Sequence, residues 1–287
     1  MVTMYLQKIV LRSLILFTAL SWIPAMADIT MGVFPRRSPA STVQLFQPLA
    51  DHLTVVLGEK VTLSVPKNFQ EFWKKLEAGE YDVVHYNQYH YIKSHKEMGY
   101  NVIAVNEEVG SKTISGALAV RADSGINSIE DLRGKTILFA GGKKAMVSYI
   151  APTAVLKKHG LEAGKDYKVK FAKNPPSAAI AVYNRAADAS GTGNIILKIK
   201  AVSEKIDTSK MKILLETDPL IHLTWAVNKD VPADVSKKLQ EAMTTLKSTE
   251  EGRKVLAGAR VTDFYKATDA DFAKIREITK FALDEDY

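Results

Sequence analysis

The stretch Lys135-Thr-Ile-Leu-Phe-Ala-Gly-Gly-Lys-Lys-Ala-Met-Val-Ser-Tyr-Ile150 is the part of the chain that best indicates its fold. It reads as a buried strand that passes through Gly141 and Gly142 directly into a helix, as in an α/β protein. The amino end of a helix carries unpaired N–H groups and partial positive charge, and glycines let an anion approach the backbone. Lys143 and Lys144 add full positive charges there. The stretch therefore predicts a site for a small oxyanion.

Strands and helices alternate on both sides of this stretch, which predicts α/β layers with largely parallel sheets. The expected strands are residues 28–34, 61–65, 81–86, 101–105, 114–121, 135–140, a segment near 169, 187–189, 212–215 and 221–227. The expected helices are one capped by Ser41 or Thr42, one from Asn68 to Gly79, a short one at 128–134, one from the glycine pair to Gly160, and 175–185, 236–246, 250–256 and 269–283.

The chain passes between two α/β blocks twice, near Gly116 and near Leu220, which predicts a two-lobed protein with a cleft. We expect lobe 1 to comprise residues 28–116 and 220–287, and lobe 2 to comprise residues 117–219. In sheets of this kind, ligands bind beyond the carboxyl ends of the strands, where helices begin. The turns in that position are 35–39, 86–91, 141–145 and 174–177.

The first 27 residues have the three parts of a secretory signal peptide. Lys8 and Arg12 form a basic region, residues 13–23 are apolar, and Ala25-Met-Ala27 is an A-x-A cleavage site. The apolar run is short for a membrane span, which favours cleavage over an uncleaved anchor. We therefore expect a mature chain that starts at Asp28 and a location in the periplasm.

The chain has no cysteine, which excludes disulfides, thiol catalysis, thiolate metal sites and a lipid-modified N-terminal cysteine. The expected mature chain has 287 − 27 = 260 residues, which is long enough to be held together by its core alone. The formal charge of +7 falls to +5 without the two basic residues of the leader, as 37 basic against 32 acidic residues. Scattered basic residues are compatible with an anionic ligand, and no motif indicates nucleic acid as a partner.

Several segments spread over the chain carry a family resemblance. They are Phe34-Pro35, Tyr81-Asp-Val-Val84, Val120-Arg-Ala-Asp-Ser-Gly-Ile126, Ser128-Ile-Glu-Asp-Leu-Arg-Gly-Lys135, Ser148-Tyr-Ile-Ala-Pro152, Asp218-Pro-Leu220 and Asn228-Lys-Asp-Val-Pro232. In this order they resemble the phosphate/phosphonate-binding family of periplasmic solute-binding proteins. The resemblance covers essentially the whole mature chain. It implies a type II periplasmic binding fold that serves an ABC importer.

Two segments depart from what this resemblance implies. Phosphonate-binding members of the family carry a Ser/Thr-rich turn at the helix start, whereas residues 141–145 contain no hydroxyl, and the first one follows at Ser148. Backbone N–H groups and lysine charge would take the place of those hydroxyl donors. Members that hold an aminophosphonate use carboxylates for its amine, whereas residues 189–194 contain no acidic side chain. This absence argues against a ligand with an amine.

The main candidates for contact with the oxyanion are Gly141, Gly142, Lys143, Lys144 and Ala145. The alternative is a tight strand-to-helix turn whose lysines point into solvent. Inside a two-lobed binding fold, the glycine backbone favours the binding interpretation because such helix starts face the cleft. The two lysines also oppose the helix dipole, which is unfavourable unless an anion lies there.

Further candidates lie at the other strand ends. Tyr86 and Asn87 offer a hydroxyl and an amide, or else belong to a helix start that packs into its lobe. Arg36 is placed to clamp an oxyanion bidentately, with a solvated turn as the alternative. Asn174 and Ser177 lie at another helix start, where helix capping explains them equally well.

Histidines supply the remaining candidates. His222, near the second crossing, is placed to close over the ligand. His85, His90 and His95 invite a metal site, but their five-residue spacing matches neither one helical face nor the i, i+4 pair. We therefore predict no metal site and no cofactor.

The resemblance and the residues together predict a periplasmic binding protein that captures phosphate, a phosphonate or a phosphite-like oxyanion by hinge closure and delivers it to an ABC permease. The alternatives are a binding protein of the same fold that signals to a membrane histidine kinase, and a binder of a different small solute or metal. We do not expect an enzyme, because the chain shows no nucleophile with a base, no paired carboxylates and no metal cluster. We expect a monomer.

Overall fold

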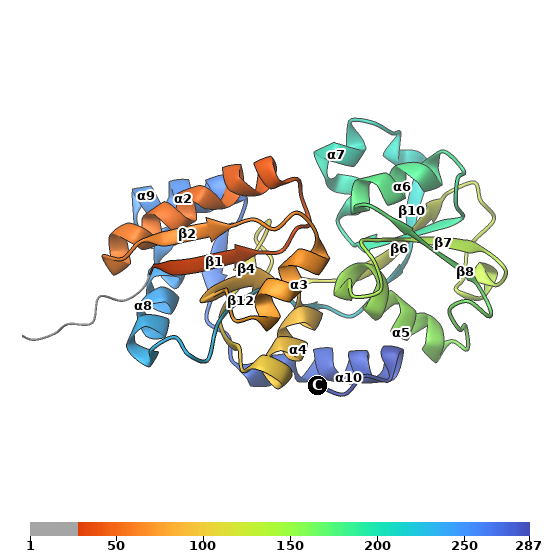
Figure 1. The fold of residues 1–287 in the computed structure, drawn as a ribbon. Coiled ribbons are helices and arrows are strands. Elements are labelled where there is room, and N and C mark those ends of the chain that lie inside the picture. The colour runs from red at the N-terminus through yellow and green to blue at the C-terminus, as the bar shows by residue number, and fades with distance from the viewer. Residues whose placement is uncertain (1–27) are drawn as a thin grey trace, which may run out of the picture.

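The computed structural model describes residues 28–287, and Figure 1 shows two lobes that lie side by side. The leader predicted at residues 1–27 lies outside the described residues. Each lobe contains one sheet flanked by helices, as the alternation of strands and helices predicted. Within the described part of the chain, no helix has both the length and the apolar character needed to cross a membrane.

The six-stranded lobe has the strand order β13-β4-β12-β3-β1-β2. Strands β1 to β4 run in one direction, while β12 and β13 run the opposite way. The strands are β1 (Ile29–Val33), β2 (Val61–Ser64), β3 (Val83–Tyr86), β4 (Asn101–Glu107), β12 (Thr224–Val227) and β13 (Asp263–Tyr265). The helices are α2 (Pro39–Leu57), α3 (Phe69–Glu77), α4 (Gln88–Met98), α8 (Ala233–Thr244) and α9 (Glu250–Ala259), with the 3₁₀ turn η5 (Leu246–Ser248).

The five-stranded lobe has the order β10-β6-β9-β7-β8, in which only β6 opposes the direction of the others. The strands are β6 (Gly116–Arg121), β7 (Thr136–Ala140), β8 (Lys168–Ala172), β9 (Ala189–Gly193) and β10 (Met211–Glu216). The helices are the π-helical η2 (Met146–Ile150), which continues into α5 (Ala151–Lys158), and α6 (Pro175–Tyr183) and α7 (Lys200–Ser203). The short 3₁₀ turns are η1 (Glu130–Leu132), η3 (Ile196–Lys198) and η4 (Thr208–Lys210). Both lobes confirm the predicted class, a mainly parallel α/β fold with two sheets.

The two chain crossings between the lobes run next to each other. Strand β5 (Thr113–Ile114) leads into the five-stranded lobe, and strand β11 (Leu220–Ile221) leads out of it. They pair with each other as a short antiparallel ribbon, with Leu220 opposite Ile114. Two adjacent extended segments of this kind form a natural hinge, because a few residues absorb the backbone rotation.

The C-terminal segment also connects the lobes. Figure 1 shows α10 (Ala273–Leu283), preceded by the 3₁₀ turn η6 (Asp269–Phe272), running beneath both of them. It packs against α4 of the six-stranded lobe and α5 of the five-stranded lobe. The Nζ atom of Lys157 in α5 donates to the carbonyl of Phe281 at 2.7 Å, and the hydroxyl of Tyr89 in α4 donates to Glu285 at 2.7 Å.

Some predicted boundaries were wrong. Helix α2 begins at Pro39 with Ser38 as its N-cap, earlier than Ser41 or Thr42, because a proline in the first turn needs no N–H partner. The strand expected at 187–189 is β9, which starts at Ala189 and contains two glycines. The expected strand 114–121 divides into β5 and β6, and the expected strand 221–227 divides into β11 and β12. Strand β13 and helices α4 and α7 were not among the expected elements, although residues 86–91 were considered as a possible helix start.

Candidate functional site

The strand-to-helix turn at residues 141–145, called the glycine turn below, lies where the five-stranded lobe faces the other lobe. Strand β7 ends at Ala140, and Gly141 and Gly142 then take φ values of +89° and +150°. Residues other than glycine rarely adopt such values. The amide of Gly141 donates to the carbonyl of Ala172 at 2.9 Å, which ties the turn to the end of β8. The glycines thus let the chain reverse within a few residues and start a helix.

The amino end of that helix leaves backbone donors free. The amides of Tyr149 and Ile150 both donate to the carbonyl of Ala145, so hydrogen bonding along the helix begins there. In the described residues, the amides of Lys143 and Lys144 donate to no protein acceptor. Neither lysine side chain has a carboxylate within ion-pair distance in residues 28–287. The glycine turn therefore concentrates unused N–H groups and positive charge at one place.

Two other glycines bring this helix close to the sheet. A Cβ atom at Gly116 of β6 would lie 2.5 Å from the carbonyl oxygen of Val147, and one at Gly191 of β9 would overlap the ring of Phe139 and the carbonyl of Ser148. Only glycine at both positions lets the first turn of the helix rest on the two strands. The position of the glycine turn thus depends on residues far from it in the sequence.

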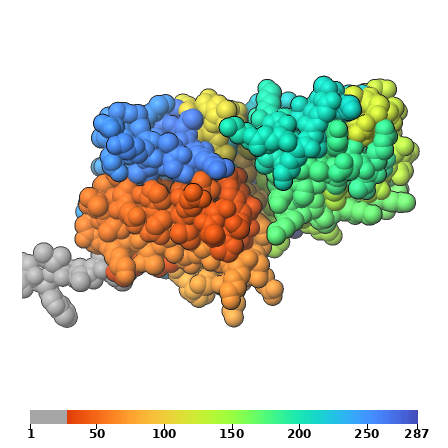
Figure 2. Space-filling view, turned by 90° about the horizontal axis from the view of Figure 1, so that it is seen from above, coloured from red at the N-terminus to blue at the C-terminus, as the bar shows by residue number. Residues whose placement is uncertain are grey.

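A cavity of about 600 Å³ lies between the glycine turn and the six-stranded lobe. Its lining residues come from both lobes: Phe69, Gln70, Trp73, Lys74, Glu77, Asn87, His90, Gly141, Gly142, Lys143, Lys144 and Ala145. The side-chain amide of Asn87 donates to the carbonyl of Lys144 at 3.1 Å, a direct bond between the lobes. Seen from above in Figure 2, the surface is hollowed along the line where the two lobes meet.

The six-stranded lobe contributes an aromatic wall to this cavity, formed by Phe69, Trp73 and His90. The His90 ring lies 5.8 Å from the ring of Phe69 and 5.5 Å from that of Trp73, measured between centroids. Burial, together with the nearby Lys144 and Lys93, lowers the pKa of His90 to about 3, so its imidazole is neutral at pH 7. The ammonium of Lys144 lies 5.4 Å from the centre of the Trp73 ring, a cation–π contact across the cavity.

A second polar group lies at the strand ends of the six-stranded lobe. The guanidinium of Arg36 pairs with Glu108 at 3.3 Å, and the Nδ2 atom of Asn106 donates to the same carboxylate oxygen at 3.0 Å. Burial alone would raise the pKa of Glu108, but Arg36 and its other neighbours outweigh it and hold the pKa at about 2. Burial and the adjacent Arg36 lower the pKa of Arg37 to about 10. Glu108 thus offsets one of the two arginine charges inside the lobe.

The structure brings six of the predicted site residues together and leaves five apart. Those that line the cavity are Asn87 and the five residues of the glycine turn. The remaining five are not among its lining residues: Tyr86, Arg36, Asn174, Ser177 and His222.

These five have partners of their own. The hydroxyl of Tyr86 is buried against Ser94 at 2.8 Å. Asn174 and Ser177 cap helix α6 reciprocally. His222 is buried near Glu108, and its Nδ1 atom accepts from the amide of Leu223 at 2.8 Å.

The other histidines that suggested a metal are His85 and the partly exposed His95, whose Nδ1 atom lies 2.8 Å from the carbonyl of Tyr100. His85 is fully buried, its Nδ1 atom lies 3.0 Å from the carbonyl of Thr224, and its ring stacks on Trp225 at 4.4 Å. Trp225 is itself a core residue. Across residues 28–287, no group of three or more histidine, cysteine or acidic side chains is arranged to hold a metal ion.

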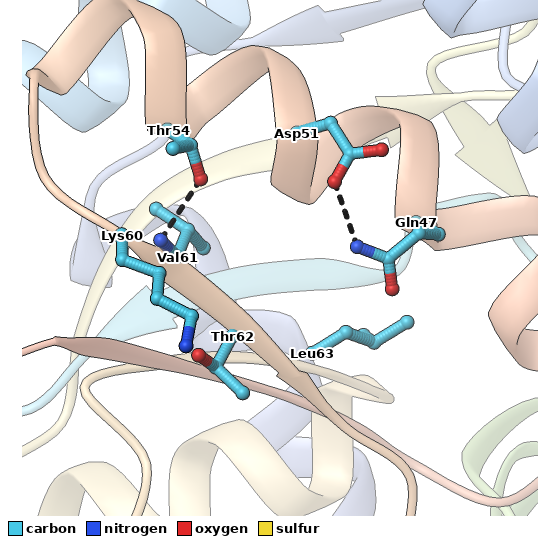
Figure 3. A pocket seen from close by; sticks show the side chains of 7 residues that line it. All are labelled: Gln47, Asp51, Thr54, Lys60, Val61, Thr62 and Leu63. Atoms are coloured by element: carbon cyan, nitrogen blue, oxygen red, sulfur yellow. Dashed lines mark hydrogen bonds between the residues drawn. The ribbon is translucent and has the colours of Figure 1, made fainter.

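Another hollow, of about 360 Å³, lies within the six-stranded lobe between α2 and β2 (Figure 3). Most of its polar side chains, those of Gln47, Asp51, Thr54 and Lys60, already have partners. The amide of Gln47 donates to Asp51 at 2.8 Å, and the backbone N–H of Val61 donates to Thr54 at 2.9 Å. It involves neither the glycine turn nor the other lobe, so it is not the candidate site.

Reasoning from the sequence missed the aromatic wall. One broad apolar stripe of α3 contains Phe69, Phe72, Trp73 and Leu76. Their spacing therefore does not distinguish residues that line the cavity from residues of the core. The structure does separate them, because Phe72 and Leu76 are fully buried while Phe69 is 41% exposed. The signal in the sequence was the surplus of aromatic residues on a helix of nine residues.

Solved structures with the same fold include several binding proteins. The binding component of an ABC phosphonate transporter from Pseudomonas aeruginosa is 15% identical, with a TM-score of 0.76 over 89% of this chain and 86% of that one. PhnD1 from Prochlorococcus marinus, solved with methylphosphonate, is 15% identical, with a TM-score of 0.75 over 88% and 97%. A Xanthomonas citri protein solved with chloride is 16% identical, with a TM-score of 0.79 over 90% and 98%.

The sequence also matches a family model directly. The family is described as "ABC transporter, phosphonate, periplasmic substrate-binding protein", and the match covers residues 31–272. That span includes the glycine turn, the aromatic wall and both crossings between the lobes. The family is a substrate-binding component of transporters and not an enzyme. The chain therefore belongs to the family of periplasmic substrate-binding proteins of phosphonate ABC transporters, as the resemblance of its motifs indicated.

Proposed function

We propose that this protein captures a phosphorus oxyanion at the glycine turn, between its two lobes, and presents it to the permease of an ABC importer. Membership of the family implies a small-molecule ligand and a permease in the membrane. The observation that carries the proposal is the glycine turn itself. The free amides of Lys143 and Lys144, the amino end of the helix and two unpaired ammonium groups all border the cavity between the lobes. Charge-assisted hydrogen bonds to such donors are the strong ones in proteins.

The proposed capture uses hinge closure. The lobes would comprise residues 28–116 with 220–287, and residues 117–219, which is the division expected from the sequence. The paired crossings β5 and β11 support a hinge at that boundary. Closure would hold the anion between the helix start of one lobe and the aromatic wall of the other, away from bulk water.

The location and the state of the protein follow from the same proposal. The family is periplasmic, and we propose that residues 1–27 are the signal peptide that exports the chain, without a lipid anchor. We further propose that the mature protein acts as a monomer. A single chain contains both lobes that border the cavity, so binding needs no second copy.

The neighbours of known structure share the fold but differ in what is bound. One was solved with methylphosphonate, and the Xanthomonas citri protein was solved with ATP as well as with chloride. All of these are anions, which supports an anionic ligand at the positively charged helix start of this protein. The organic part of the ligand depends on the cavity of this protein.

The test is calorimetric titration of residues 28–287 with phosphate, phosphite and methylphosphonate. A Lys143→Ala/Lys144→Ala variant should lose at least about tenfold in affinity for whichever anion binds, because charge-assisted contacts contribute about 1.5–3 kcal/mol each. The matched control is Lys168→Ala/Lys170→Ala, which removes the same charge from exposed positions of β8 in the same lobe. Equal losses in both variants, or binding untouched by either, would refute the glycine turn as the anion site.

A further inference from the structure

The cavity at the glycine turn is larger than a simple oxyanion requires. Its volume of about 600 Å³ lies in the range of about 300–1,000 Å³ that is typical of pockets for drug-sized molecules. At about 30 Å³ per water, it would accommodate roughly 20 waters, whereas a tetrahedral oxyanion occupies only its charged end. The remaining space borders α3 and the start of α4.

The far side of the cavity presents aromatic rings that the core does not use. Phe69 is 41% exposed and Trp73 is half-buried, although both are large and apolar. The neighbouring Phe72 and Leu76 on the same helix are fully buried. Two aromatic side chains left accessible side by side in a cavity form a surface for an apolar partner.

These rings are held in place before any ligand arrives. The indole N–H of Trp73 donates to Glu77 at 2.6 Å, which fixes the plane of the ring. His90 is only 3% exposed, packs against Phe69, Phe72 and Trp73, and leaves its buried Nδ1 atom without a partner in the described structure. Because these rings are ordered before binding, little conformational entropy is lost when a ligand packs on them.

Charge is distributed unequally along the cavity. Its lining residues include three lysines, Lys143 and Lys144 of the glycine turn and Lys74 of α3, but one carboxylate, that of Glu77, which accepts from the indole of Trp73. The ammonium of Lys144 lies 5.4 Å from the centre of the Trp73 ring, so one small molecule can contact both the lysine and the aromatic wall.

We infer that the ligand is an aryl or heteroaryl phosphonate or phosphate ester, whose oxyanion lies at the glycine turn and whose flat ring stacks on Trp73 and Phe69. This inference rests on the proposed function, because it assigns the organic part of the same ligand. Stacking of aromatic pairs contributes beyond the area that they bury, so the ring adds both affinity and selectivity.

The experiment compares phenylphosphonate with methylphosphonate by calorimetric titration of residues 28–287. Phenylphosphonate should bind at least tenfold more tightly. Trp73→Leu should reduce that ratio to about one to two while changing the methylphosphonate affinity less than about twofold. Phe69→Ala is the second variant, in case Trp73→Leu folds poorly. Phe171→Ala, equally 41% exposed but outside the cavity, is the matched control and should keep the full ratio.

The outcomes separate this inference from the function on which it rests. If methylphosphonate binds as tightly as phenylphosphonate, the aromatic subsite is refuted while anion capture stands. If phenylphosphonate is preferred but neither Trp73→Leu nor Phe69→Ala reduces the preference, the ring lies elsewhere and the assignment is refuted. If neither compound binds but phosphate or phosphite does, this inference is refuted while anion capture stands; if none of the four binds, both are refuted.

Discussion

The two lobes differ in how the polar groups at and near the interlobe cavity are used. In the five-stranded lobe, the glycine turn leaves the amides of Lys143 and Lys144 without protein acceptors. In the six-stranded lobe, Asn87 donates to the carbonyl of Lys144 and accepts from the amide of His90, while Arg36, which does not line the cavity, is paired with Glu108. Residues of equally suitable chemistry thus differ in whether their hydrogen bonds are already used. The comparison teaches that candidate binding residues are better chosen by whether their hydrogen-bonding groups are still unpaired than by residue type alone.

The largest effect is expected at Gly191, where the absence of a side chain lets the helix that follows the glycine turn pack on the sheet. In Gly191→Ala the new methyl group would overlap Phe139 and the helix carbonyl of Ser148, so we expect a loss of about 3 kcal/mol in unfolding free energy and weaker anion binding. Urea unfolding and phosphonate titration measure the two effects. The control in the other lobe is Gly32→Ala, whose Cβ would lie 2.6 Å from the Tyr81 ring. It should destabilise the protein without weakening binding, and weakening by both variants would contradict the comparison.

Acid should act mainly on the six-stranded lobe. The pKa values of His85 and His90 are both lowered to about 3 by burial, whereas an unfolded histidine titrates near 6.5. The unfolded chain therefore takes up protons first, and stability is full above pH 7 and falls as the pH drops from 6.5 towards 3. At pH 5 the loss is about 2 kcal/mol for each histidine.

The measurement is urea unfolding at pH 7.5 and pH 5.0. His90→Phe, which keeps a ring among its aromatic neighbours, should remove about 2 kcal/mol of the difference between the two pH values. His159→Gln, at an exposed position of the five-stranded lobe, is the control and should leave the difference unchanged. An unaltered pH dependence in His90→Phe would show that this histidine is not held neutral.

The paired charges of the six-stranded lobe should matter for stability more than for binding. Glu108→Gln leaves Arg36 and Arg37 without their counter-charge, and we expect a loss of about 1–2 kcal/mol because the Arg36–Glu108 pair is only partly buried. The double variant Arg36→Gln/Glu108→Gln should recover most of it in a double-mutant cycle. If Glu108→Gln weakened phosphonate binding as strongly as the lysine double variant does, the contrast between the two sides of the cavity would be wrong.

The smallest effect is expected where the C-terminal helix meets the crossing between the lobes. Lys274 of α10 pairs with Asp218 at 3.0 Å, but both side chains are exposed. Lys274→Ala should leave the melting temperature unchanged within error, because exposed ion pairs contribute little. A clear decrease, measured by thermal unfolding, would show that this surface contact helps to hold the two lobes together.

Much of the fold could be predicted from local patterns. The step from β7 through Gly141 and Gly142 into a helix was predicted from one strand-like run, two glycines and a helical run. The elements that were missed or misjudged show the limit of such patterns. Strand β13 has only three residues, too few for a recognisable alternation, and the π-helical start of the helix at Met146 has no signature in spacing.

The candidate site shows the same limit more strongly. The glycine turn was predicted because all its residues are adjacent in sequence. The aromatic wall was not, because Trp73 and Lys144 come together from positions 71 residues apart, and Arg36 meets Glu108 across 72 residues. Which polar side chain is already satisfied depends on such distant contacts. Tyr86 and Asn174, chosen for their chemistry, have partners within their own lobes.

Local sequence was therefore sufficient for the class of fold, the order of its elements and the positively charged helix start, because glycine conformations and hydrophobic periodicity act over a few residues. The size of the cavity, its aromatic wall and the seating of the helix on Gly116 and Gly191 came from the packing of remote segments. Side chains of the same type are core, cap or binding surface according to which neighbours the folded chain places beside them, and that placement is a property of the whole packed structure.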